Sequence, residues 1–154
     1  MKTIIIDNWL SKDFQLYINN LFLYYTPHWW GHKSSFTQKN AKTFYSCKLN
    51  IEDSLYSFLG QKALDTIRKG TLKRMYINIQ HPGMDSSYHT DDGNITAIYM
   101  ATKTLPKGGA FIIKGEKEIP FVQGRFIAFD ATKLHKAKAP LKGEARITLA
   151  FKTI

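Results

Sequence analysis

The sequence predicts a mainly β member of the α+β class, a double-stranded β-helix of the jelly-roll or cupin type with supporting N-terminal helices. Two apolar stripes with helical spacing lie before residue 70, and short alternating strands separated by turns follow it. At 154 residues and 44% hydrophobic content, the chain is long enough to bury one core. We therefore expect a single domain, 1–154, in which 1–70 support a barrel formed by 71–154.

The first predicted elements lie in the N-terminal seventy residues. Lys2 to Ile6 is a short apolar run, and Ser11 is a suitable N-cap for a helix that ends before Pro27. Residues 28–40 are expected to form a loop, with at least one of Trp29 and Trp30 in the core. The expected buried stripe of the helix comprises Phe14, Ile18, Leu21, Phe22 and Tyr25.

A strand and a second helix complete this support. Residues 41–49 alternate as a strand does, and Asn50 is then expected to cap a helix with Asp53 in its first turn. Gly70 is expected to end that helix. Its predicted buried stripe is Leu55, Leu59, Ala63 and Ile67.

Eight short strands are predicted in the second half, which suits a closed double-sheet barrel because such a barrel pairs eight antiparallel strands. The predicted strands are Leu72–Gln80, Ser87–Thr90, Ile95–Thr102, Ala110–Lys114, Glu118–Val122, Arg125–Phe129, Leu134–Lys138 and Ala145–Thr153.

The composition restricts the cellular setting and the partners. The single Cys47 cannot form an internal disulfide, and neither a signal peptide nor an apolar run of membrane-spanning length is apparent, so we expect a cytoplasmic protein without a membrane partner. The net charge of +10 favours an acidic partner or nucleic acid, although dispersed lysines also serve solubility. Part of this charge, on Lys133, Lys136, Lys138 and Lys142, is expected near the mouth of the candidate site, because these lysines flank His135.

His89, Asp91 and His135 are the candidate metal ligands. In a strand, His89 and Asp91 point to the same side, and His135 follows another strand-like run. Two imidazoles and one carboxylate are the ligands of non-haem Fe(II) sites that keep positions open for oxygen chemistry. Each residue alone has an ordinary structural explanation, a polar turn or a hydrogen-bonded histidine, and a zinc hydrolase uses a similar ligand set.

Arg146 and Thr148 add a candidate anion site. They share one face of the predicted last strand, while Ile147, Leu149 and Phe151 share the other. If this strand returns beside the segment that carries His135, the guanidinium lies near the metal. The alternative is the solvated face of an edge strand.

In its second half, the chain resembles the 2-oxoglutarate- and Fe(II)-dependent oxygenases, especially their prolyl 4-hydroxylase-like branch. The resemblance covers residues 74–153, and residues 4–11 also look like the start of such domains. It is carried by Gln80–Gly83, His89–Asp91, Thr96–Tyr99, Gly108–Phe111, Gly124–Asp130, His135 and Arg146–Thr148.

This resemblance implies roles for individual residues. It makes His89, Asp91 and His135 the ligands of Fe(II), and it makes 2-oxoglutarate and O2 the cosubstrates, with ascorbate as a candidate reductant. Arg146 would pair with the distal carboxylate of 2-oxoglutarate, and Thr148 would hydrogen-bond it. Tyr99, Gln80 and Asn78 are expected to line the cosubstrate pocket, Gln80 standing where many relatives have tyrosine.

The implied activity is hydroxylation of a C–H bond in a protein or peptide side chain, with proline as one candidate. It would be coupled to decarboxylation of 2-oxoglutarate to succinate. Retention of Asp91 favours hydroxylation, since halogenating relatives lack the carboxylate. The alternatives are a nucleobase oxygenase or demethylase of the same chemistry and a non-catalytic cupin-like barrel that binds an acidic ligand. Substrate identity, target atom and oligomeric state do not follow from the sequence, and specificity is expected in residues 29–40 and 84–88.

Overall fold

A computed structural model describes residues 1–33, 41–105 and 107–154. In these residues the first elements are β1 (Ile4–Ile6), α1 (Lys12–Asn20), the π-helix η1 (Leu21–Tyr25), β2 (Trp29–Lys33), β3 (Thr43–Leu49) and α2 (Ser54–Ile67). The remaining strands are β4 (Leu72–Gln80), β5 (Ile95–Met100), β6 (Phe111–Ile113), β7 (Phe126–Asp130), β8 (His135–Ala137) and β9 (Arg146–Thr153).

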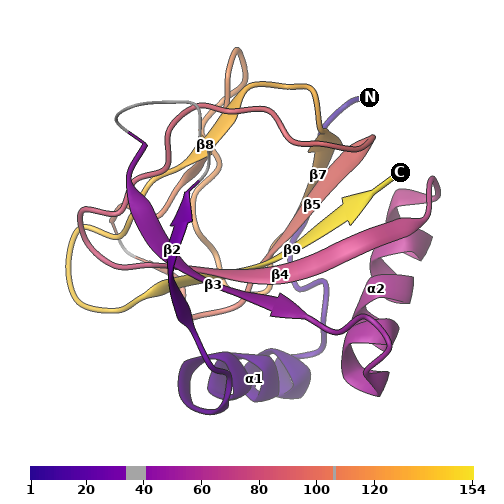
Figure 1. Ribbon diagram of the computed structural model, residues 1–154, viewed down its shortest axis with the longest axis horizontal. Coiled ribbons are helices and arrows are strands. Elements are labelled where there is room, and N and C mark those ends of the chain that lie inside the picture. The colour runs from indigo at the N-terminus through magenta and orange to yellow at the C-terminus, as the bar shows by residue number, and fades with distance from the viewer. Residues whose placement is uncertain (34–40, 106) are drawn as a thin grey trace.

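Seven strands form the larger sheet, in the order β1-β7-β5-β9-β4-β3-β2, and all of its pairings are antiparallel. The helices α1 and α2 lie on one side of this sheet, away from β8 (Figure 1). The larger core lies between the helices and the sheet, where Ile18, Leu59, Ile77, Leu149 and Phe151 are buried. Strand alternation explains this, because Leu149 and Phe151 point to the helices while Thr148 and Ala150 point to the opposite face.

The smaller sheet pairs β6 with β8. A second core separates it from the larger sheet and includes Ile98, Phe111, Ile127 and Phe129. Together, the two sheets and the helices give the predicted mainly β double-stranded β-helix. The segment expected as a largely helical support also contributes β1, β2 and β3 to the larger sheet.

Two predicted strands of the barrel are wrong. Residues 87–90 make only an isolated bridge, in which His89 and His135 exchange backbone hydrogen bonds of 2.9 and 3.0 Å. Residues 118–122 make one bridge, between Ile119 and Phe111, and Pro120 has no N–H with which to extend it. The other six predicted strands are present, and β4 has the predicted bounds.

The helices begin and end differently from the prediction. Ser11 caps α1 as expected and accepts a hydrogen bond from the Phe14 amide. The π-helical turn then rotates the last residues, so Tyr25 is 78% exposed and does not belong to the buried stripe. For α2 the N-cap is Asp53, whereas Asn50 closes a turn before it. The helix ends before Gly70, with Arg68 in the left-handed conformation.

Strand β2 replaces the first part of the predicted loop. It pairs with β3 through a bulge at Gly31, whose φ of 118° suits glycine. Trp29 and Trp30 are 69% and 59% exposed, so the expectation that one of them is buried is wrong; the buried tryptophan is Trp9. Residues 34–40 of the predicted loop lie outside the described residues. No helix in the described part of the chain is long and apolar enough to cross a bilayer.

Candidate metal centre

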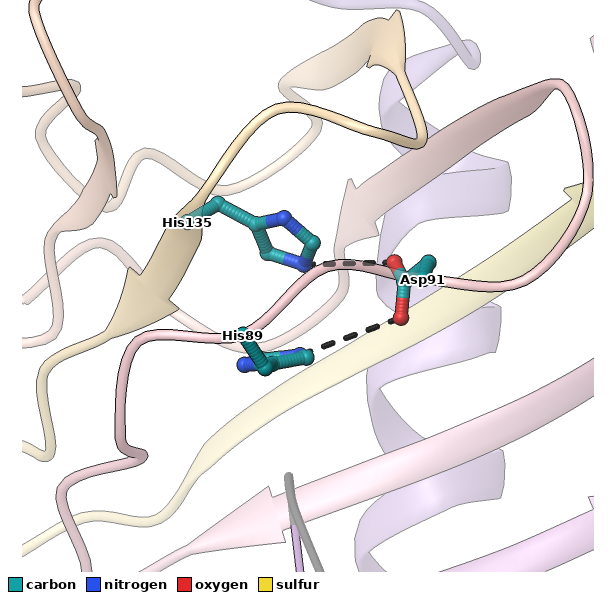
Figure 2. Close-up of side chains that lie close together, drawn as sticks. All are labelled: His89, Asp91 and His135. Carbon is teal, nitrogen blue, oxygen red and sulfur yellow. Dashed lines mark ion pairs between the residues drawn. The ribbon is translucent and has the colours of Figure 1, made fainter. Parts of the chain in front are cut away.

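The side chains of His89, Asp91 and His135 converge at one point (Figure 2). One donor atom from each lies within 4.8 Å of the others. Nε2 of His89 is 3.8 Å from Asp91 Oδ1, and Nε2 of His135 is 3.2 Å from Asp91 Oδ2. His135 begins β8, and the backbone bridge to His89 brings the two rings to 4.3 Å between centroids. The bridge is therefore what assembles the two imidazoles.

Both imidazoles have the orientation that a metal ligand requires. Nδ1 of His89 lies 2.8 Å from the Ser87 carbonyl, and Nδ1 of His135 lies 2.8 Å from the Lys133 carbonyl. A carbonyl oxygen only accepts hydrogen bonds, so each Nδ1 carries the proton and each Nε2 presents its lone pair to the centre. Burial also lowers the pKa of His89, which favours the neutral imidazole that binds metals.

Asp91 is held by two groups that the sequence analysis did not identify. The Thr96 hydroxyl donates a hydrogen bond of 2.6 Å to Asp91 Oδ2, and the Lys152 ammonium forms an ion pair with the same oxygen. Burial alone would raise the pKa of Asp91, but the charge of Lys152 and the hydrogen bond that it donates hold it far below its ordinary value. Lys152 could have been found, because it shares a strand face with Arg146 and Thr148.

A cavity of about 420 Å³ adjoins the three donors and extends across the face of the larger sheet. Arg146 lines it and is only 1% exposed. Its Nε donates to the Gly109 carbonyl at 2.7 Å, and its Nη1 donates to Gln80 Oε1 at 2.8 Å. Nη2 is buried and has no hydrogen-bond partner among the described residues. Burial lowers the pKa of Arg146 to about 9, so the guanidinium is still charged at neutral pH.

The other expected cosubstrate contacts divide into two groups. Gln80, Asn78 and Thr148 line the cavity with Arg146, and the buried Asn78 Oδ1 has no partner in the described part of the chain. Tyr99 does not line the cavity. It lies on the opposite face of β5, in the core, with its ring 5.6 Å from that of Trp9. The expectation for Tyr99 failed because Thr96 and Ile98 are the β5 residues on the cavity face.

The four lysines that flank His135 in the sequence are not among the cations that line the cavity. Lys133 and Lys138 pair with Glu116 and Glu118 at 2.6 and 2.8 Å, and Lys136 lies over the Tyr88 ring. Neither they nor Lys142 line the cavity. The cations that do line it are Lys33, Lys48, Arg74, Arg146 and Lys152.

The arrangement fits a ferrous ion and a keto-diacid. Two neutral imidazoles and a carboxylate leave one side of the centre open to the cavity, as a ferrous site for oxygen chemistry requires. The unpartnered Nη2 of Arg146 is a buried charged donor without an acceptor, and a ligand carboxylate would supply one.

No protein-family model and no curated protein matches the sequence of this chain. Its fold, however, matches solved structures. A Pseudomonas putida prolyl-4-hydroxylase superimposes with a TM-score of 0.74 at 12% identity, over 99% of this chain and 92% of that protein. A Trichoplax adhaerens prolyl hydroxylase, solved with a peptide fragment of the hypoxia inducible factor oxygen degradation domain, gives 0.70 at 12% identity, over 98% and 83%.

The same fold is found in proteins with other activities. The non-heme alpha-ketoglutarate-dependent epimerase SnoN from nogalamycin biosynthesis superimposes with a TM-score of 0.69 at 10% identity, over 97% of this chain and 74% of that protein. Identities this low establish the fold and leave the reaction open. This chain has the double-stranded β-helix fold of the 2-oxoglutarate- and Fe(II)-dependent oxygenases.

Proposed function

We propose that this protein is an Fe(II)- and 2-oxoglutarate-dependent dioxygenase that hydroxylates a C–H bond of a protein or peptide side chain. The single observation that carries the proposal is the convergence of His89, Asp91 and His135 in a cavity that the buried guanidinium of Arg146 also lines. Bound there, ferrous iron with 2-oxoglutarate and O2 supplies the oxidation, while 2-oxoglutarate is converted to succinate and carbon dioxide.

The residues of the chain hold and orient the reactants. His89 and His135 present Nε2 because backbone carbonyls fix their Nδ1 protons. Asp91 Oδ2 is occupied by Thr96 and Lys152, which leaves Oδ1 as the oxygen for the metal. Lys152 also compensates the charge of a carboxylate that is largely buried.

Within the same cavity, Arg146 binds the distal carboxylate of 2-oxoglutarate through Nη2. Gln80 orients the guanidinium by accepting from Nη1, while its own amide donates to the Met84 carbonyl at 2.6 Å. Thr148 and Asn78 lie on the same wall and offer further hydrogen bonds. Burial of Arg146 excludes water, so the carboxylate is bound with little competition from solvent.

Peptide as the substrate class is supported by the likeness to prolyl hydroxylases, one of which was solved with a peptide. Because the fold also occurs in an epimerase, the reaction needs a direct test. The chain should be incubated with Fe(II), 2-oxoglutarate and cell extract, with succinate release and gains of one oxygen atom in peptides followed by mass spectrometry.

The matched pair of variants is Asp91→Ala and Asp92→Ala. Both carboxylates line the cavity, but Asp92 pairs with Arg74 at 2.5 Å and does not face the histidines. Loss of a residue that only hydrogen-bonds to a metal ligand weakens metal binding by up to roughly 100-fold. In Mn(II) titrations we expect Asp91→Ala to weaken binding by more than this, because the ligand itself is lost. Asp92→Ala should change it little. Equal Mn(II) binding by both variants, or none by the unmodified chain, would favour a non-catalytic ligand-binding barrel.

A further inference from the structure

The segment that carries His89 lies along one edge of β8, and β6 pairs with the other edge of that strand. His89 and His135 exchange backbone hydrogen bonds of 2.9 and 3.0 Å, as two opposite residues of an antiparallel ladder do. The next pair of this kind lies two residues further along each strand. A regular ladder would therefore join Ser87 to Ala137.

The hydrogen bonds depart from this register after His89. The Ala137 carbonyl accepts a hydrogen bond of 2.9 Å from the Ser86 amide, one residue earlier than a regular ladder requires. The Ala137 amide donates to the side-chain hydroxyl of Ser86 at 2.6 Å. An extra residue is thus accommodated between the two points of contact, as in a β-bulge. A side-chain oxygen of Ser86 takes the place that the Ser87 carbonyl would have in the ladder.

The Ser87 carbonyl is turned to a different group. It lies 2.8 Å from Nδ1 of His89, so it holds the proton on Nδ1 and leaves Nε2 for a metal. The carbonyl can turn to the imidazole because the Ala137 amide is satisfied by another oxygen. The Ser86 hydroxyl suits this place, since it accepts from the Ala137 amide and also donates to the Ala137 carbonyl at 3.3 Å.

The second histidine does not depend on Ser86. Nδ1 of His135 lies 2.8 Å from the Lys133 carbonyl. Lys133 precedes β8, and its own amide closes a turn by donating to the Asp130 carbonyl at 3.0 Å. The orientation of the Lys133 carbonyl is therefore set by that turn. The two imidazoles use the same kind of acceptor, but only the acceptor of His89 has been released from a strand ladder.

We propose that Ser86 is a positioning residue for His89: its hydroxyl replaces the Ser87 carbonyl in the β8 ladder, so that this carbonyl fixes the imidazole tautomer that binds the metal. Ser86 is only 7% exposed, so water does not readily replace its hydroxyl. Without the hydroxyl, the Ala137 amide draws the Ser87 carbonyl back to the regular register, and Nδ1 of His89 loses its acceptor. This inference rests on the proposed function for the identity of the metal, but the tautomer is measurable without metal.

The test is Ser86→Ala, with the ring-nitrogen chemical shifts of His89 measured by NMR in the metal-free full chain at a pH where the imidazoles are neutral. The unmodified chain should show His89 with its proton on Nδ1, whereas Ser86→Ala should show a mixture of the two tautomers. Mn(II) binding should weaken about tenfold, the lower end of the range for a lost outer partner of a metal ligand. His135 is the internal control and should keep its proton on Nδ1 in both proteins.

Further variants separate the hydroxyl from a general loosening of the segment. Ser86→Thr retains a hydroxyl and should restore both the His89 tautomer and the affinity for Mn(II). Asp85→Ala removes another side-chain contact of the same segment, the 2.7 Å hydrogen bond that Asp85 Oδ1 accepts from the Ala139 amide, and should leave both readouts unchanged. If Ser86→Ala does not fold, Ser86→Cys replaces it, because a thiol is a weak acceptor of similar size.

Three results would overturn the proposal. A single Nδ1–H tautomer of His89 in Ser86→Ala, with unchanged Mn(II) affinity, would show that the Ser87 carbonyl keeps its place without the hydroxyl. Equal effects of Asp85→Ala would mean that any loosening of the segment disturbs His89. Failure of Ser86→Thr to restore the tautomer would remove the hydroxyl as the cause.

This proposal and the proposed function fail in different ways. If Ser86→Ala changes the His89 tautomer but the unmodified chain binds no Mn(II), the proposed function is wrong and the positioning role of Ser86 stands. If the unmodified chain binds Mn(II) and releases succinate while Ser86→Ala keeps both the tautomer and the affinity, the proposed function stands and the positioning role is wrong.

Discussion

Asp91 is bound by more groups than the proposed role as a metal ligand requires. Its Oδ2 interacts with Lys152, Thr96 and His135, while Oδ1 faces His89. Lys152 is itself 1% exposed, so two opposite charges are buried together beside the proposed iron. Such a pair neutralises Asp91 when the metal is absent, but its cation opposes the metal when the metal binds.

Lys152→Met tests this balance. We expect Mn(II) to bind about tenfold more tightly, because a buried positive charge near the metal is removed. The metal-free protein should lose about 3 kcal/mol of stability, since Asp91 would remain buried without its cation. Thermal unfolding with and without Mn(II) measures both effects. Lys48→Met is the control, as Lys48 lines the same cavity without an ion pair to Asp91. Weaker Mn(II) binding in Lys152→Met would show that Lys152 mainly holds the carboxylate in position.

Arg146 supports a second prediction at this scale. At 100 times its Kd, 2-oxoglutarate should stabilise the protein by about 2.7 kcal/mol, which raises Tm by roughly 5 to 10 °C for a chain of this size. Arg146→Ala should abolish that rise, because the buried Nη2 donor is lost. Lys33→Ala keeps Arg146 and should keep the rise. Differential scanning fluorimetry in the presence of Mn(II) measures the rise in Tm. If Arg146→Ala showed the full rise, 2-oxoglutarate would bind at a site other than Arg146.

At the scale of elements, α2 fixes the sheet whose other face forms the cavity. Leu59, Ala63 and Ile67 of α2 are buried in the larger core, as predicted from their spacing. The helix approaches β4 so closely at Gly60 that an added Cβ would lie 2.5 Å from Leu72 Cδ2. Gly60 therefore allows α2 to pack closely against β4.

Adjacent residues of α2 give a matched pair of stability variants. Leu59→Ala should lower the free energy of unfolding by about 2 to 5 kcal/mol, since Leu59 is fully buried and its loss leaves a cavity. Phe58→Ala should cost less than about 1 kcal/mol, because Phe58 is 54% exposed. Urea unfolding monitored by circular dichroism measures both. Similar costs for the two variants would mean that α2 packs on the sheet through a different face.

The elements differ in how well the sequence predicts them. Strand β4 was predicted with its bounds because Met75, Ile77 and Ile79 alternate with more polar residues and no glycine or proline interrupts residues 72–80. The loop prediction for β2 failed, since Gly31 interrupts the alternation there and the strand continues past it through a bulge. The π-helical turn at residues 21–25 also escaped prediction, because a pattern based on 3.6 residues per turn cannot register a wider turn.

For the whole molecule, paired carboxylates offset part of the large positive charge. Asp7 pairs with Arg125 at 2.6 Å, Asp92 with Lys73 and Arg74, and Glu116 with Lys133. Hydrogen bonds from these partners lower the pKa of all three carboxyls below the ordinary values of 3.8 for aspartate and 4.5 for glutamate. A carboxyl with a lowered pKa in the folded state contributes stability above its ordinary value, and this is lost as the pH falls through the lowered value.

The urea midpoint should therefore change little between pH 7 and about 5 and then fall as the pH drops below about 4. Asp92→Asn should make that fall shallower, because one of the titrating ion pairs is gone. Glu52→Gln is the control, as Glu52 is exposed and pairs with no cation in the described part of the chain. A midpoint that rises on acidification would contradict the assignment of these pairs as stabilising.

The candidate site was largely predictable because its key residues lie in short motifs. Arg146 and Thr148 share a face of β9 through strand alternation, while His89 and Asp91 are two residues apart in a segment that is held by the backbone bridge to His135. Thr96 and Lys152 were missed because their role is to contact Asp91. Thr96 lies on β5 and Lys152 on β9, so these contacts form only in the folded chain. Tyr99 was misplaced because the resemblance did not settle which face of β5 its side chain occupies.

Strand β9 lies between β4 and β5 and carries Arg146 near its start and Lys152 near its end. A slip of one residue against either neighbour would turn both cations into the apolar interior and bring Ile147, Leu149 and Phe151 to the reactants. A slip of one residue would thus remove both cations from the cavity together. The burial of Ile147, Leu149 and Phe151, which sets the register of β9, therefore also directs Arg146 and Lys152 toward the cavity.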